Sequence, residues 1–297
     1  MTVPGLPPVD PPFPVLAPHR VVPAPRPLGA APHLVLDAGW PAAVARRLQR
    51  LDDEVVVRDP DRPDDHGLAA ALRAAWSLLP PQGLRLLGLA VDLDRMTARQ
   101  PAESALQEAT DAVVRRTGLD LLVVGWLLAC SADLVVLRRR GEGLLAAELL
   151  AVTFPSGWPV RRRAGASLTE LHAPVADGER LQRAAPALSE ALLTKGPYVQ
   201  HVWGIDPCGR LDQDPDVAYP PEPVRWHLRV ERQTTLPLPH LDRALFVIQP
   251  YLTPVDALTP SQRTTLGAAL ASLSPAARSY KHVPDELIAQ LCDGSAG

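Results

Sequence analysis

The chain has 297 residues, of which 46% are apolar, enough to bury the core of one large domain or two small ones. Its formal net charge of −3 argues against an electrostatic nucleic-acid binder. The three cysteines, Cys130, Cys208 and Cys292, form no CxxC pair, which argues against a zinc ribbon, a disulfide scaffold, or an iron–sulfur cluster held by this chain alone.

The first residues are rich in proline, with eleven prolines among residues 1–32. Proline fixes φ and lacks a donor N–H, so we expect residues 1–34 to form an extended arm that drapes over the domain. No basic segment is followed by an apolar one, so no signal peptide is expected. The longest apolar run, 119–130, is too short to span a bilayer. We therefore expect a reducing cytoplasm and no membrane partner.

Helical periodicity dominates the next part of the chain. Apolar residues recur at three to four positions over 39–51, and a second helix is expected over 67–79, after a loop at 58–67. Pro101 suits the first turn of a third helix that ends at Gly118. The length and leucine content of 119–130 favour a buried helix over a buried strand.

The pattern then changes to strands. Residues 132–139 and 144–154 predict a β-hairpin with a Gly-containing turn, and a helix is expected over 179–193. A strand at 198–206 precedes a second hairpin of 226–239 and 244–255, with a closing helix at 261–273. The expected class is α+β: an antiparallel sheet of about five strands covered on one side by helices, in a single domain over 35–290, with 291–297 as a tail.

Familiar catalytic motifs are missing from the sequence. It contains no P-loop, GxGxxG, HExxH or GxSxG pattern, and its eight histidines show no i, i+4 pair. The sequence therefore does not predict an all-protein metal site. A single histidine can still ligate the iron of a cofactor.

The segment WHLRVERQTTLPLP, 226–239, carries charge in an otherwise apolar strand. Because side chains alternate along a strand, Arg232 shares one face with apolar residues, whereas Arg229, Glu231 and Gln233 share the other. Two interpretations are open. The strand is either half-solvated with a Glu–Arg pair, or it lines a polar site for a cofactor or substrate.

Several blocks of the sequence resemble the haem-dependent oxidative N-demethylase family. They occur in the family's order: GEGLLAAELLAVTFPSGW at 141–158, GASLTELHAPV at 165–175, VERQT at 230–234, ALFVIQPYLTP at 244–254, and Tyr280-Lys281. The resemblance covers roughly residues 35–285. The chain departs from the family at Thr153, where relatives commonly have cysteine, and after Gln233-Thr234, where two basic residues are replaced.

The resemblance implies a PAS-like sheet that binds a non-covalent haem b. It implies oxidation of a small secondary amine or N-methyl compound with O₂, with electrons from flavin and a [2Fe–2S] cluster. This chain has neither a flavin fingerprint nor a cluster's cysteines, so it would be the haem subunit, served by a separate reductase. The alternatives are a non-catalytic haem-binding sensor or carrier on the same fold, and a ligand-free member whose VERQT block is a salt-bridge network.

The resemblance also suggests site residues. His172 is the candidate axial ligand of the haem iron, and it is equally compatible with a structural role in fixing the loop before Pro174. His201, on a strand, is the alternative ligand. Arg229 and Arg232 are candidates to pair with the propionates, and Glu231 with an ammonium substrate. Trp158 and Trp203 would flank the macrocycle or belong to the core. Thr153 occupies the position of the family cysteine and cannot supply a thiolate.

Overall fold

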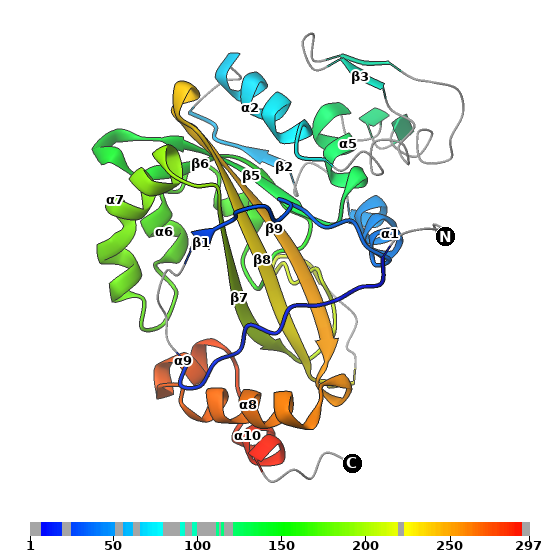
Figure 1. Cartoon of the computed structure of the whole chain (residues 1–297), viewed down its shortest axis with the longest axis vertical. Coiled ribbons are helices and arrows are strands. Elements are labelled where there is room, and N and C mark those ends of the chain that lie inside the picture. Colours follow the sequence, from blue (N-terminus) through cyan, green and yellow to red (C-terminus); the bar gives the residue numbers. More distant parts are fainter. Residues whose placement is uncertain are drawn as a thin grey trace.

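A long antiparallel sheet organises the part of the chain that the computed structural model describes, which is residues 7–19, 25–50, 56–61, 66–79, 90–92, 97–99, 111–112, 114–115, 121–218 and 223–292 (Figure 1). Seven strands pair in the order β1-β7-β8-β9-β5-β6-β2. Their bounds are β1 Arg26–Pro27, β2 Val56–Arg58, β5 Asp133–Arg139, β6 Leu145–Ala151, β7 Tyr198–Asp206, β8 His227–Leu238 and β9 Arg243–Pro254. A separate ribbon pairs β3 Ala90–Asp92 with β4 Thr97–Arg99.

The α+β class and the five long strands of the sheet are as predicted, including both hairpins. The strand count was too low, because β1 and β2 have only two and three residues and give no readable alternation. Most of the helix expected between Pro101 and Gly118 lies outside the described residues. Only 111–112 and 114–115 of that segment are described, and they are helical.

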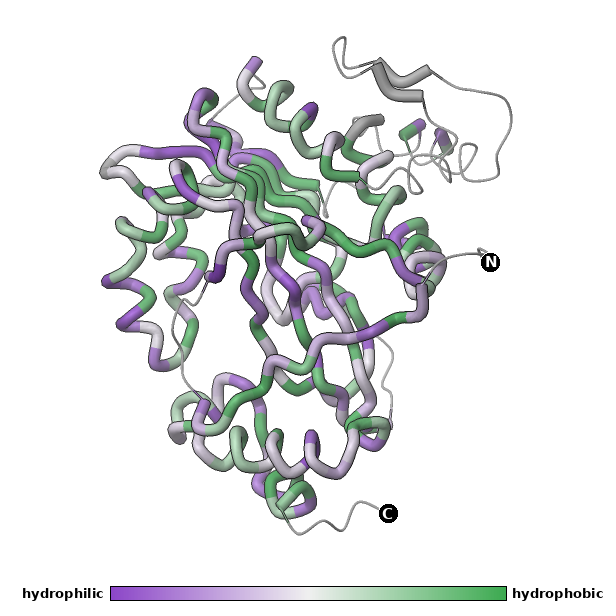
Figure 2. Tube along the Cα trace, in the orientation of Figure 1, coloured by the Kyte–Doolittle hydropathy of each residue, from purple (hydrophilic) through white to green (hydrophobic). Residues whose placement is uncertain are grey.

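Helices cover both faces of the sheet, so the prediction of helices on one side was wrong. On one face, α1 Trp40–Arg50, α2 His66–Trp76 and α5 Leu121–Ala129 pack against side chains that include Val136 and Val247. On the opposite face, α7 Glu179–Thr194 packs against the neighbouring residues Val135 and Ile248. The reason is visible in β5, where successive residues are apolar, so that both faces must be buried. Figure 2 shows this hydrophobic part of the sheet beneath α2 and α5.

A third helical group closes the opposite end of the sheet. It consists of α8 Pro260–Ala271, α9 Pro275–Tyr280 and α10 Asp285–Cys292, which form a cluster with Leu228, Val230 and Tyr251. The side chain of Thr259 accepts a hydrogen bond from the backbone of Gln262 and so begins α8 in a capping box. The helix expected to close the chain is thus followed by two more short helices.

The proline-rich segment crosses the sheet twice, on the face that carries α1, α2 and α5, which we call the arm face (Figure 1). Residues 7–19 pass over the end near α8, where Val15 is buried. Residues 25–37 return past β1 to α1, and the side chain of Gln249 both donates to and accepts from the backbone of Val35. The opposite face, covered in part by α6 Leu168–His172 and α7, is called the α7 face below.

Candidate functional site

A strip of polar side chains crosses β7 and β8 on the α7 face. The register pairs Val202 with Glu231 and Gln200 with Gln233, and such directly opposed residues point to the same face. Val202 is 41% exposed, one of the more exposed large apolar side chains among the described residues. The Glu231 side chain is 13% exposed. Gln200, Val202, Glu231 and Gln233 therefore form a polar strip that the helices of this face leave partly uncovered.

Hydrogen bonds connect the polar strip from one side to the other. Gln200 donates through Nε2 to Oε1 of Gln233 at 2.8 Å, and Gln233 donates through Nε2 to Oε2 of Glu231 at 3.1 Å. The other carboxylate oxygen of Glu231 accepts from Arg229 at 3.5 Å. The chain of contacts fixes the orientation of the Glu231 carboxylate beside an exposed apolar residue, which is a geometry suited to a small polar ligand.

Arg229 serves as a clamp at one end of the strip. Its guanidinium donates to the backbone carbonyl oxygens of Leu211 at 2.8 Å and Phe154 at 2.7 Å, and its side chain is 4% exposed. It thereby ties two loops to the sheet. β8 is not half-solvated, because residues on both of its faces are buried. The charges in this strand have defined partners within the protein.

Arg232 and His201 lie on the other side of the sheet. They are directly opposed in β8 and β7, on the arm face. Arg232 donates to the backbone carbonyl oxygens of Pro32 and His33 in the arm. The two arginines predicted to contact propionates therefore point to opposite faces, and a haem on one face can be contacted by only one of them.

His172 ends α6, a short helix that begins with a capping box between Ser167 and Glu170. Its Nδ1 lies 2.8 Å from the carbonyl oxygen of Leu168. Because a carbonyl only accepts, Nδ1 carries the hydrogen, and the lone pair of the neutral ring is on Nε2. Burial lowers the pKa of His172 below its ordinary value and favours this neutral form. A neutral imidazole oriented by a backbone carbonyl is a common arrangement for a metal ligand.

The alternative histidine, His201, is also kept neutral. Its pKa is lowered by burial and further by the positive charges of Arg232 and Arg26. Among the described residues, no group of three or more His, Cys, Asp or Glu side chains is arranged to hold a bare metal ion. A haem differs, because the macrocycle supplies the equatorial nitrogens and the protein needs to supply only an axial ligand.

Trp158 and Trp203 pack at the edges of different clusters. Trp158 is half-buried against the cluster on the α7 face, to which Leu171 of α6 also belongs. Trp203 packs at the edge of the cluster around α8 on the arm face. Trp158 is thus on the same side of the sheet as the polar strip and α6, whereas the Trp203 ring is on the other side.

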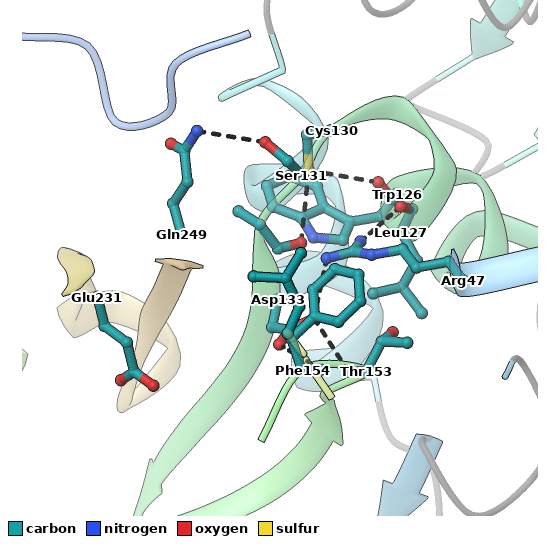
Figure 3. A network of polar contacts seen from close by, with 12 residues as sticks. Arg47, Trp126, Leu127, Cys130, Ser131, Asp133, Thr153, Phe154, Glu231 and Gln249 are labelled. Carbon is teal, nitrogen blue, oxygen red and sulfur yellow. Dashed lines mark hydrogen bonds and ion pairs between the residues drawn. The ribbon is translucent and has the colours of Figure 1, made fainter. Parts of the chain in front are cut away.

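Thr153 belongs to a buried network rather than to the polar strip (Figure 3). Its backbone N–H and that of Phe154 donate to the two carboxylate oxygens of Asp133, each at 3.0 Å. Asp133 also pairs with Arg47 at 2.9 Å. The Thr153 hydroxyl is buried and has no hydrogen-bond partner among the described residues. Burial raises the pKa of Asp133 to about 6, while Arg47 and the two N–H groups oppose that rise.

Reasoning from sequence alone did not select Lys281 as a site residue. This lysine follows α9, and its ammonium donates to the backbone carbonyl oxygen of Trp203 at 3.2 Å. The neighbouring Tyr280 is 45% exposed. The signal was present, because Tyr280-Lys281 is one of the blocks that match the family. What the sequence lacked was any indication that this block meets β7.

In a comparison with known protein families, one family model matches a part of the chain that contains most of the described sheet. The family model described as "Haem-dependent oxidative N-demethylase, alpha subunit-like" matches residues 108–286. No curated protein matches the chain. Within the described part of the chain, the helices are too short or too polar to cross a membrane. The match spans more than half of the sequence and includes β5 to β9, α6 and Lys281, so the chain belongs to the haem-dependent oxidative N-demethylase alpha subunit-like family.

Proposed function

We propose that this chain binds haem b on the α7 face and oxidises a small secondary amine or N-methyl compound. In the reaction, R₂N–CH₃, O₂, two electrons and two protons give R₂N–H, formaldehyde and water. The observation that carries the proposal is the polar strip, where an oriented carboxylate lies beside an uncovered apolar residue on the same side of the sheet as His172 and Trp158. The family match supports it.

The residues on the α7 face are of the types that hold a haem. His172 has the neutral ring and the carbonyl-bound Nδ1–H expected of an axial ligand, and we propose it for that role. Trp158 and Val202 offer apolar surface for the macrocycle. Arg229 is on the correct face for a propionate, whereas Arg232 and the alternative ligand His201 are not. When bound, the haem would supply the activation of O₂.

Glu231 would hold the substrate. A small aliphatic amine is mostly protonated at neutral pH, so its ammonium needs a partner, and the proton must leave before the N-methyl group is oxidised. The carboxylate of Glu231 can accept a hydrogen bond from the ammonium and then take its proton. Gln233 and Arg229 hold the carboxylate in place for this step. Thr153 lies in the buried network and has no part in it.

The electrons would come from a partner. A [2Fe–2S] cluster needs four ligands, usually cysteines, and this chain has only three cysteines, one of which is the fully buried Cys130. We therefore propose a separate reductase subunit carrying flavin and the cluster, in keeping with the description "alpha subunit-like". In this proposal residues 35–290 act as one domain, 1–34 as its arm and 291–297 as a tail.

A spectrum and a product assay test the proposal. The purified chain, expressed with added haem, should show a Soret band, and with O₂, a reductant and a secondary amine it should release formaldehyde. Glu231→Gln should keep the Soret band and lose most formaldehyde release. The exposed Glu179→Gln in α7 is the matched control and should change neither. A chain without a Soret band contradicts the proposal.

One observation favours a second function. Both carboxylate oxygens of Glu231 already accept hydrogen bonds within the protein, one from Gln233 and one from Arg229. A carboxylate satisfied in this way also suits a sensor or carrier that binds haem without oxidising an amine. A Soret band without formaldehyde release from any amine would favour that function.

A further inference from the structure

Lys281 lies at the free edge of β7, and its position is fixed from two directions. Beyond Val199, β7 has no described strand on its outer side, because β1 pairs only with Tyr198 and Val199. The Lys281 ammonium donates to the carbonyl oxygen of Trp203 at this edge, and it lies 5.9 Å from the Trp203 ring centroid. Its backbone N–H donates to the carbonyl of Ala277 at the end of α9. The sheet therefore holds the side chain of Lys281, and the helix holds its backbone.

Gly204 shows that the ammonium also lies near the α7 face of the sheet. The register pairs Gly204 with Arg229, so a side chain at 204 would point to the α7 face, as those of Val202 and Glu231 do. The position that a Cβ of Gly204 would take is 3.9 Å from Nζ of Lys281. The ammonium therefore lies at the edge of β7, near both this position on the α7 face, which has no side chain of its own, and the Trp203 ring on the arm face.

Glu231 and Lys281 are two opposite charges that share this region without touching. Burial lowers the pKa of Lys281, and the Glu231 carboxylate opposes that by attracting the ammonium. Yet within the described residues no ion pair joins them, and Glu231 is bound instead by Arg229 and Gln233. An ammonium has three N–H donors, and among the described residues only the carbonyl oxygen of Trp203 accepts a hydrogen bond from it. Donors remain for an anionic group.

We propose that Glu231 and Lys281 together recognise a zwitterion, so that the substrate is a small N-methylated amino acid rather than a simple amine. The methylated ammonium group binds to Glu231, and the carboxylate binds to Lys281. Two complementary charges on the ligand match the two separated charges of the protein, whereas a simple amine would meet only one of them and would be repelled by the other. This inference rests on the proposed function, whose active carboxylate is the same Glu231.

The test compares three probes on the haem-loaded chain by calorimetry: N-methylglycine, which is a zwitterion, dimethylamine, which is a cation, and acetate, which is an anion. N-methylglycine should bind about tenfold more tightly than either of the others. Lys281→Met should remove most of that preference and leave dimethylamine binding unchanged or stronger. Lys281→Arg should keep the preference. The matched control is Lys195→Met, because Lys195 is the other lysine of the chain and is exposed. This variant should behave as the unaltered chain.

The outcomes separate this inference from the function on which it rests. If dimethylamine gives formaldehyde and binds as tightly as N-methylglycine, the proposed recognition of a zwitterion is wrong, whereas the proposed oxidation of an amine stands. Absence of N-methylglycine binding by the haem-loaded chain also overturns the inference. If the chain takes up no haem, the proposed function fails. If Lys281→Met does not fold, as judged by circular dichroism, the comparison of the three probes on the unaltered chain still decides.

Discussion

Arg229 and Arg232 are three residues apart in β8, yet their guanidinium groups bind opposite layers of the protein. Arg229 holds the backbone at Phe154 and Leu211 on the α7 face, whereas Arg232 holds Pro32 and His33 on the arm face. An odd separation along a strand places two side chains on opposite faces. The charged strand β8 thus binds segments on both faces of the sheet. Of its two arginines, only Arg229 borders the polar strip.

Replacement of Arg232 should loosen the arm. Arg232→Met removes two charge-assisted hydrogen bonds and leaves the carbonyl oxygens of Pro32 and His33 with one donor fewer, so the free energy of unfolding should fall by about 1.5–3 kcal/mol. Amide hydrogen exchange of residues 33–37 should become faster. Arg225→Met, which removes a pair that is more than 60% exposed on both sides, is the control and should have little effect. Unchanged exchange in the arm would contradict the role given to Arg232.

The ion pair between Arg47 and Asp133 should be far more sensitive. Neither side chain is exposed, so Arg47→Met leaves a buried carboxylate without its counter-charge, and the free energy of unfolding should fall by about 3–5 kcal/mol. Urea denaturation of the variant measures this. The adjacent Arg46 is exposed on the same helix, and Arg46→Met should stay within about 0.5 kcal/mol of the unaltered chain. Equal losses in the two variants would show that the buried pair is unimportant.

Stability should decrease as the pH falls below the ordinary histidine pKa of 6.5. Burial lowers the pKa values of His19, His33, His172 and His201 in the folded state. Between the folded and unfolded pKa values of these four histidines, the unfolded chain binds more protons, so together they make the free energy of unfolding rise with pH. Asp133, whose pKa is raised to about 6, is a single group that acts in the opposite direction. Urea denaturation at about pH 7.5 and about pH 5.5 checks the sign.

His33 should account for part of that dependence. Its Nε2 is buried, with no hydrogen-bond partner in the described part of the chain, and the positive charge of Arg232 adds to the effect of burial in lowering its pKa. In His33→Gln the difference in unfolding free energy between the two pH values should shrink. His240, an exposed histidine in the turn between β8 and β9, provides the control, since His240→Gln should leave the difference as it was. A His33 variant with the full pH dependence would refute this assignment.

The two candidate haem ligands can be separated because they lie on opposite faces. His172→Ala should lower haem occupancy or shift the Soret band, whereas His201→Ala should preserve both, since His201 is on the arm face, opposite Arg232. Added imidazole should restore the spectrum of His172→Ala if the missing group is the axial ligand. The reverse pattern would move the proposed haem to the arm face.

Local sequence patterns were sufficient to predict the long helices and strands. The strand of 198–206 and the helix of 179–193 were predicted within a residue of their ends, because alternation and helical spacing are properties of a short window. The family also followed from five short blocks. By contrast, β1 and β2 are too short to show a period, and their pairing depends on distant strands.

The site was only partly predictable for the same reason. The alternation of side chains placed Glu231 and Arg232 on opposite faces of the strand. The sequence could not show that the guanidinium of Arg232 would donate to the carbonyl oxygens of Pro32 and His33. Nor could it show that Lys281, after α9, would reach the edge of β7 beside Gly204. The sequence by itself determined the elements, the family and the alternation of charge in β8. Only the tertiary structure decided which face each charge serves, because contacts between residues 78 or 200 positions apart depend on how the sheet and its helices pack.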